Sequence, residues 1–235
     1  MKELDRLEEN NGLLSYLPAI MVIVGAFAML GVRIQVGASF ISDTALMMIA
    51  LACYILAALF QLTNLYAPSS MAEKIGLYGA SLGVFFNLSS WLIRWVAAYD
   101  RELAMMRESG NMATPWLFRY IPFANLYDLS LAFAFGAGIT TLLFARRSNF
   151  RVLTAFTLPL AALILILARF IGGEFIDLPP VLDSYWRPIH VGVASLSYGI
   201  ALVCFAVAVV YLLKDRVKVE AMAIWSSLFA VSVIA

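Results

Sequence analysis

Charged residues and histidine are scarce in this sequence. Asp, Glu, Lys and Arg make up 13% of the 235 residues, hydrophobic residues make up 63%, and the mean hydropathy is +0.90. A water-soluble protein of this length needs a larger charged surface to cover its core, so the composition indicates an integral membrane protein. The formal net charge is only +1, which argues against nucleic acid as a partner.

Cysteine and the common catalytic motifs are also nearly absent. Cys53 and Cys204 each lie within an apolar run, where we expect small core residues rather than a disulfide. The sequence has no Cys-x-x-Cys-His site for covalent haem attachment, so we do not expect the chain to be a cytochrome c. It also lacks a nucleophile–base pair, a phosphate-binding loop and a second histidine, which argues against self-contained hydrolytic or phosphoryl-transfer chemistry.

Long apolar runs predict an all-α protein, a polytopic membrane helix bundle that forms one domain over residues 1–235. The first run is too long for a signal-peptide core and shows no small-residue cleavage site, so we interpret it as a retained helix. Six full transmembrane helices plus the start of a seventh, near 221–235, are expected; the six lie near 13–32, 43–64, 76–98, 123–144, 152–171 and 189–213.

The short loops predict the orientation of these helices. Arginine crowds the loop near 145–151, and lysine and arginine crowd the loop near 214–220, so both should be cytoplasmic under the positive-inside rule. The loops near 99–121 and 172–188 should then be external. The first part of the 99–121 loop is predicted to be a short amphipathic helix on the membrane surface, with Met105 and Met106 toward the lipid.

His190 is the only histidine in the chain, and it lies where a proline-containing polar loop becomes the sixth helix. A neutral imidazole there is free to ligate a metal, and haem iron is the usual metal for a membrane histidine without cysteine or carboxylate partners. The alternative is a residue that only caps a helix in the headgroup region. Both interpretations stay open on position alone.

Three arginines, Arg94, Arg169 and Arg187, are predicted near the external face. They could bind the two propionates of haem, because guanidinium groups match carboxylates. They could equally be interfacial anchors or pair with acidic residues at 100, 174 or 183. Aromatic residues on the same side form either an ordinary interfacial belt or a shelf for a porphyrin; these are Trp91, Trp95, Trp116, Tyr120, Tyr185 and Trp186.

Asn125 and Asp128 are one helical turn apart at the start of the fourth predicted helix, so they share a face, whereas Tyr127 points elsewhere. Asn125 follows a proline closely and can accept from a free amide of the first turn. We therefore expect these residues to support the external loops structurally.

Two ordered motifs resemble the CcsA/ResC family of haem-handling membrane proteins in cytochrome c biogenesis. Residues 180–186, Pro-Val-Leu-Asp-Ser-Tyr-Trp, together with His190-Val191 and Ser197-Tyr198, are similar to the segment around an external histidine of that family. Residues 122–128, Pro-Phe-Ala-Asn-Leu-Tyr-Asp, resemble its Pro-x-Ser-Asn-x-Tyr-Glu motif, with Ala124 and Asp128 as substitutions. Arg94-Trp95 also resembles an Arg-Trp pair of the family, and the likeness extends from about residue 91 to the C-terminus.

This resemblance implies a subunit that holds a transient b-type haem at the external face for attachment to apocytochrome c. His190 would be the metal ligand, and Arg94, Trp186 and Arg187 would contact the haem. A CcsB/ResB-like membrane protein would be the partner, and the two proteins together would form a cytochrome c synthase (haem lyase). The location would be a bacterial inner membrane or a thylakoid membrane.

The sequence departs from the family in one large feature, the tryptophan-rich external loop with the signature Trp-Gly-x-x-Trp-x-Trp-Asp, which does not occur within the 235 residues. A truncated chain is the favoured interpretation, and a naturally shortened relative is the other. A non-enzymatic structural or haem-bearing subunit of a respiratory complex is the alternative function.

Overall fold

The computed structural model describes residues 16–37, 40–176 and 184–214, and within these ranges the chain is helical with no strand. Six helices are long and apolar enough to cross a membrane, which confirms the predicted all-α membrane bundle. They are α2 (Leu17–Val36), α3 (Asp43–Tyr66), α4 (Ser70–Glu108), α5 (Leu126–Ala145), α6 (Thr154–Ile171) and α7 (Arg187–Lys214). Two short 3-10 helices, η3 (Leu117–Tyr120) and η4 (Ser148–Leu153), lie in the connections. The predicted start of a seventh helix lies outside the described residues.

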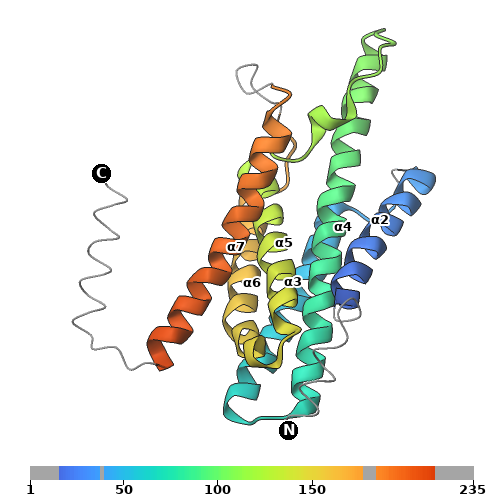
Figure 1. The fold of residues 1–235 in the computed structure, drawn as a ribbon. Helices are drawn as coiled ribbons and strands as arrows, with labels where there is room; N and C mark the ends of the chain where they lie inside the picture. The colour runs from blue at the N-terminus through green and yellow to red at the C-terminus, as the bar shows by residue number, and fades with distance from the viewer. Residues whose placement is uncertain (1–15, 38–39, 177–183, 215–235) are drawn as a thin grey trace, which may run out of the picture.

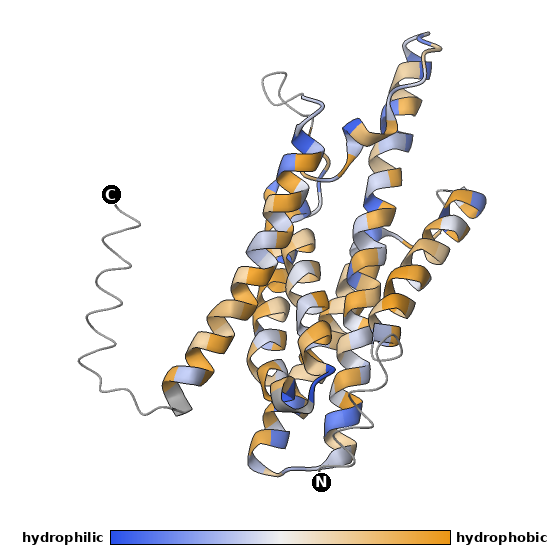
Figure 2. Cartoon of the chain, in the orientation of Figure 1, coloured by the Kyte–Doolittle hydropathy of each residue, from blue (hydrophilic) through white to orange (hydrophobic). Residues whose placement is uncertain are grey.

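The helices form one bundle in which α3, α4, α5 and α6 pack together, while α2 lies against α4 and α7 lies mainly against α5 (Figure 1). Small side chains dominate the core: Ala50, Ala57, Ala80, Ala134, Ala137 and Ala161 are almost fully buried. Small residues let membrane helices approach closely, and close approach supplies the packing energy that lipid tails do not provide. Large apolar side chains instead lie exposed on the outer surface of α2 and α7, and the ribbons of both helices are coloured mainly as hydrophobic in Figure 2.

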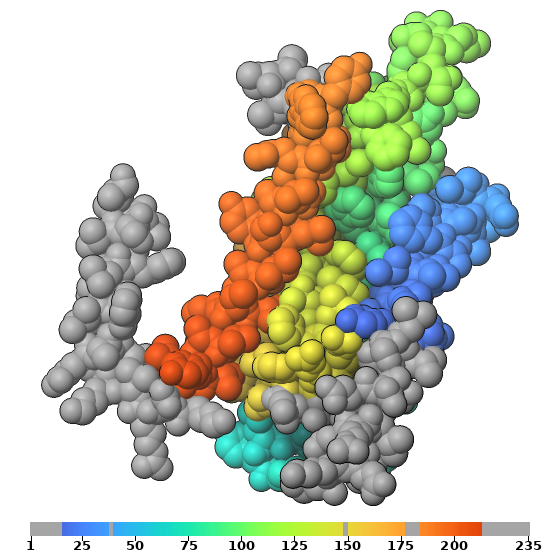
Figure 3. Space-filling view, viewed as in Figure 1, coloured from blue at the N-terminus to red at the C-terminus, as the bar shows by residue number. Residues whose placement is uncertain are grey.

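One end of the bundle brings together the end of α4, the start of α5, the end of α6 and the start of α7. We call it the outer end, after the predicted orientation. The space-filling view shows the start of α7 beside the connection between α4 and α5 at this end (Figure 3). A hydrogen bond of 2.5 Å from Arg187 Nη2 to the carbonyl oxygen of Arg119 joins the two segments.

The prediction of a separate surface helix after residue 98 is wrong. Instead, α4 continues without a break for 39 residues, a length of about 58 Å at ~1.5 Å per residue, against about 30 Å for the hydrocarbon core. Residues 99–108 are mainly strong helix formers and contain no glycine or proline, so the helix propagates until Gly110, whose φ is +78°. The end of α4 therefore rises above the other helices (Figure 1), and the connection to α5 begins at Ser109.

The crossing of α5 and α7 depends on two glycines, Gly136 and Gly199. A Cβ atom added to Gly199 would lie 2.6 Å from the Cα and carbonyl carbon of Gly136 and 2.7 Å from the backbone nitrogen of Ala137. These contacts are with backbone atoms, which cannot move aside as a flexible side chain can. Only glycine at position 199 therefore permits this separation of the two helices.

We predict that Gly199→Ala pushes α7 away from α5 and lowers the free energy of unfolding by about 1–3 kcal/mol, the usual cost of overpacking. Denaturation of the purified protein in detergent measures this loss. Gly31→Ala in α2 is the matched control, because a Cβ there meets no atom within 4 Å; its stability should be unchanged or slightly higher. Equal stability of the two variants would contradict the packing argument.

A second prediction concerns orientation. In a chain whose two native cysteines are replaced by alanine, a cysteine at Ser109 should react with a membrane-impermeant thiol reagent added to intact cells. A cysteine at Ser148 should react only after the membrane is opened, because Ser148 lies in the arginine-rich connection that the positive-inside rule places in the cytoplasm. The reverse labelling pattern would invert the topology.

Candidate functional site

Arg94 lies in α4 at the outer end, and its side chain is buried, with 1% of the residue exposed. Its guanidinium forms ion pairs with Asp128 of α5 and, at 3.1 Å, with Asp43 of α3. It also donates to the carbonyl oxygens of Gly173, at 2.8 Å, and Glu174, at 3.2 Å, in the segment after α6. One side chain thus joins three helices and a loop. We call Arg94, Asp43 and Asp128 the Arg94 cluster.

The acidic partners expected from the sequence differ from those observed. Arg94 touches Glu174 only through the backbone carbonyl. Asp100, another expected partner, pairs instead with Arg33 of α2 at 3.0 Å, and the third, Asp183, lies outside the described residues. Asp43 was missed because it opens a different helix, and no local pattern connects it with Arg94.

The Arg94 cluster satisfies the requirements of a buried charge. Removing a charged group from water is costly unless it is paired and its remaining donors and acceptors are hydrogen-bonded. Besides its bond to Arg94, Asp128 accepts at Oδ2 from the backbone N–H of Ala124, at 3.1 Å. The cluster contains one positive and two negative groups, so it forms a buried polar junction that fixes the outer end.

Asn125 connects the same junction to the start of α5. Its Oδ1 accepts from the backbone N–H of Asp128 at 2.8 Å, so the predicted helix cap is present. Its Nδ2 donates to the carbonyl oxygen of Glu174 at 3.1 Å. That carbonyl oxygen therefore accepts from both Asn125 and Arg94, and the segment after α6 is tied to α4 and α5 at one point.

Tyr127 also contacts Arg94, although helical spacing places it on another face from Asn125 and Asp128. The Cζ atom of Arg94 lies 4.5 Å from the centroid of the Tyr127 ring and 4.4 Å from that of Phe175. Tyr127 is 1% exposed. Contact with aromatic faces stabilises a guanidinium by about 0.5–2 kcal/mol, so all three motif residues of α5 act around the same arginine.

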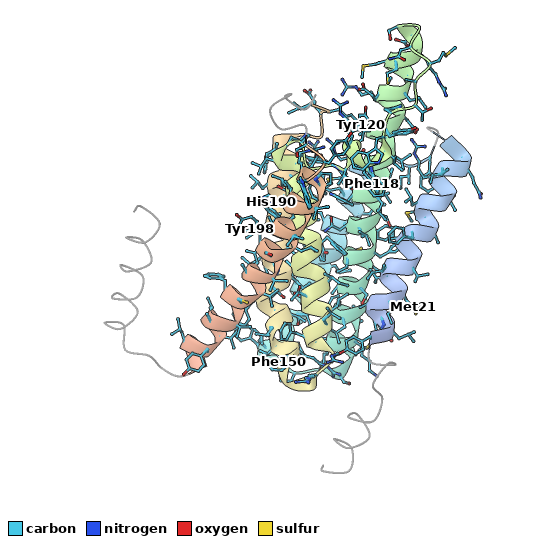
Figure 4. All side chains as sticks on the ribbon, turned by 45° about the horizontal axis from the view of Figure 1, so that its top comes forward. Met21, Phe118, Tyr120, Phe150, His190 and Tyr198 are labelled. Atoms are coloured by element: carbon cyan, nitrogen blue, oxygen red, sulfur yellow. The ribbon has the colours of Figure 1, made fainter. Side chains whose placement is uncertain are left out.

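His190 lies on the outward side of α7, near the start of the helix, and its side chain is exposed (Figure 4). It lines a shallow apolar groove of about 440 Å³ formed by the start of α7 and the residue before it, and the other lining residues are Trp186, Ile189, Val193 and Ala194. Trp186 is 74% exposed. The groove therefore offers one imidazole nitrogen ligand beside an aromatic and aliphatic surface.

The structure separates the four residues that the sequence analysis grouped around haem. Trp186 and His190 line the groove on α7. Arg94 and Arg187 line a different hollow, a cleft of about 430 Å³ between α4, the α4–α5 connection and the start of α7. Arg119 also lines this cleft; the sequence analysis missed it because nothing in the local pattern distinguishes it from an ordinary loop arginine.

The aromatic residues of the outer end fall into two groups, those that hold the α4–α5 connection and those that are exposed. Trp91 donates from Nε1 to the carbonyl oxygen of Pro122 at 3.3 Å, and Trp95 donates to that of Leu117 at 2.9 Å. These two residues fasten the α4–α5 connection to α4. Trp116 and Tyr185 form an exposed pair with ring centroids 5.1 Å apart. Among the described residues, no group of three or more His, Cys, Asp or Glu side chains could hold a metal ion.

This combination defines a polytopic helical membrane protein with a single exposed histidine at the mouth of one helix and a buried ionic junction beside it. Residues 123–233 match the family model of the cytochrome c assembly protein, a range that contains α5, α6 and α7. The match confirms the resemblance to the CcsA/ResC family, and this segment of the chain is similar to the cytochrome c assembly proteins.

Curated relatives agree with this assignment. The chain is 34% identical over 101 residues to the cytochrome c biogenesis protein CcsA of Synechococcus elongatus, which is 41% of this chain and 31% of the relative. It is 27% identical over 166 residues to CcsA of Prochlorococcus marinus, covering 65% of this chain and 52% of the relative. It is 30% identical over 148 residues to protein NrfI of Wolinella succinogenes, covering 57% and 14%. The chain thus spans about half or less of these relatives, and no solved structure matches it.

We predict that Arg94→Gln lowers the free energy of unfolding by about 3–5 kcal/mol, because it leaves the buried carboxylate of Asp128 and the partly buried carboxylate of Asp43 without their cation. Arg107→Gln is the matched control: Arg107 is an exposed arginine on the same helix, and its replacement should change stability by no more than about 0.5 kcal/mol. Denaturation in detergent compares the two variants. Wild-type stability of Arg94→Gln would show that the junction does not hold the outer end together.

Proposed function

We propose that this chain is a haem-handling membrane subunit of cytochrome c maturation that holds haem at its outer end for attachment to apocytochrome c. The observation that carries the proposal is the family match over residues 123–233, because this range includes Asn125, Tyr127 and Asp128 as well as α7, the helix that contains His190. In the proposal haem is the cargo, a b-type haem bound transiently. The protein works in a bacterial inner membrane or a thylakoid membrane.

The chemistry of the groove on α7 suits this cargo. His190 supplies the ring nitrogen that haem iron accepts as an axial ligand. Apart from the imidazole, the groove is lined by Trp186, two aliphatic residues and an alanine, a surface suited to the apolar face of a porphyrin. Because His190 is exposed, an incoming haem reaches it without rearrangement of the bundle.

Arg94 has an indirect role in this proposal. Its guanidinium is buried and makes four donations to protein acceptors, so it positions the loop after α6 and does not contact haem propionates itself. That loop precedes α7 in the chain. Asn125, Tyr127 and Asp128 act through the same junction. Arg187, three residues before His190, is the arginine that we place within reach of a propionate.

In this proposal the chain contributes to the reaction by positioning haem. Joining haem to a cytochrome adds a cysteine thiol S–H across each vinyl group, a step with no leaving group and no net transfer of electrons. The contribution of the chain is to hold the porphyrin so that its vinyl edge faces apocytochrome c. A CcsB/ResB-like membrane protein completes the cytochrome c synthase assembly in this proposal.

The test is the optical spectrum of the purified full-length protein reconstituted with haem. His190→Ala should leave the bundle folded but remove or shift the haem absorbance bands, because the axial ligand sets the electronic state of the iron. Added imidazole should partly restore the original bands by filling the vacated position. The fold should survive, since an exposed side chain loses little packing on truncation.

Tyr198→Phe provides a control on the same helix. Tyr198 is 60% exposed and does not line the groove, so this variant should keep the wild-type spectrum. If His190→Ala also keeps it, His190 is not the ligand and the proposed haem site on α7 is wrong.

A further inference from the structure

The side of α7 that faces away from α5 is exposed along the helix, and α7 lies at one edge of the described bundle (Figure 1). The buried side packs mainly against α5 and contains Ser195, Gly199, Val203 and Ala206. Successive residues of a helix are turned by about 100°, so positions 197, 201, 204 and 208 lie opposite these four. All four opposite positions are exposed.

The exposed side carries a regular row of small side chains. The row consists of Ala194, Ser197, Ala201, Cys204 and Ala208, and its spacing alternates between three and four residues. Larger exposed side chains flank the row, with Val193, Ile200 and Val207 on one side and Tyr198 and Phe205 on the other. We call the row and its flanks the α7 face. Small residues at this spacing let a second membrane helix approach closely, a purpose that contact with lipid alone does not require.

The chain itself supplies an apolar segment directly after α7. The helix ends at Lys214, and six mainly charged and polar positions, 215–220, separate it from residues 221–235. Residues 221–235 contain no charged side chain. Both stretches lie outside the part of the chain that the structure describes, but the sequence of the second carries a pattern that matches the α7 face.

Small residues recur in this segment at helical spacing. Ala223, Ser226, Ser227 and Ala230 follow one another at positions that share one side of a helix. Trp225, Leu228 and Phe229 fall on the opposite side. Two rows of small residues that face each other allow two membrane helices to pack with their backbones close together.

The two rows also lie at matching depths. Six residues span at most about 20 Å, so a helix formed by residues 221–235 begins close to the end of α7 and runs antiparallel to it. Cys204 lies ten residues before Lys214, and Ala230 lies nine residues after Ala221. At ~1.5 Å per residue, each is about 14–15 Å from its end of the connection.

We propose that residues 221–235 form a helix that packs antiparallel on the α7 face, with Ala230 beside Cys204. A six-residue tether gives this segment a high effective concentration at the α7 face, which a second copy of the chain does not have. The segment rises toward the groove that contains His190, because Ala194 belongs both to the groove lining and to the α7 face. The proposal does not depend on haem binding.

Disulfide formation in membranes tests this contact. In full-length protein, every cysteine except Cys204 is replaced by alanine, and Ala230→Cys is added. Oxidation should join the two thiols within one chain, because facing small residues bring Cα atoms to the separation of about 4.4–6.8 Å that a disulfide needs. The product should run as a monomer on a non-reducing gel. Trypsin cleaves after Lys214 and Lys218, so mass spectrometry should find the peptide of Cys204 linked to the peptide of position 230.

Two further variants test the faces of the helices. Leu228→Cys in place of Ala230→Cys puts the thiol on the opposite side of the segment and should give at least about fivefold less linked product. Ala208→Phe, combined with Ala230→Cys, should lower the yield to a similar extent, because the added ring separates the two rows. Ala208 is exposed in the described bundle, so this change leaves the packing of α7 on α5 intact.

Three results would overturn the proposal. Equal yields from Ala230→Cys and Leu228→Cys, or no linked product from either, would show that lipid covers the α7 face. A yield that Ala208→Phe does not change would show that the two rows do not meet. A covalent dimer formed when Cys204 is the only cysteine would show that a second copy of the chain occupies the face.

Discussion

The outer end of this protein depends on one buried positive charge. The guanidinium of Arg94 lies in a membrane bundle with almost no exposure, where an unpaired cation would be strongly destabilising. Its partners come from α3, α5 and the segment after α6. Because these elements must all meet the same side chain, their positions at the outer end are fixed together, and the α5 motif residues take their places around it.

Two different surfaces follow from this arrangement. The loop after α6 is held at Gly173, Glu174 and Phe175, and α7 begins beyond it with Arg187 toward the cleft and His190 on the outward side. In the function that we propose, the groove presents an imidazole to haem iron. Arg187 and His190 line different hollows, although they are three positions apart in the chain.

In the rest of the bundle, contacts between small side chains, and not ion pairs, hold the helices in place. Alanine and glycine at the helix contacts allow close approach, most clearly where Gly199 meets Gly136. That crossing fixes α7 against α5, since α7 has few contacts with the other helices. The position of α7, which carries His190, is thus determined mainly by a glycine contact with α5.

The amino-acid sequence by itself determined which segments cross the membrane, because about 20 consecutive apolar residues have no other stable environment. It also determined the cap of α5 by Asn125 and the location of His190 at a helix mouth, since both are local features. It failed for residues 99–108, where a surface helix was expected and a continuation of α4 is found. Tertiary structure alone decided that Arg94 pairs with Asp43 and Asp128 and that Arg187 and His190 line different hollows. Ion-pair partners and the faces of a helix depend on which neighbours pack against it, and the spacing of residues along one chain does not specify those neighbours.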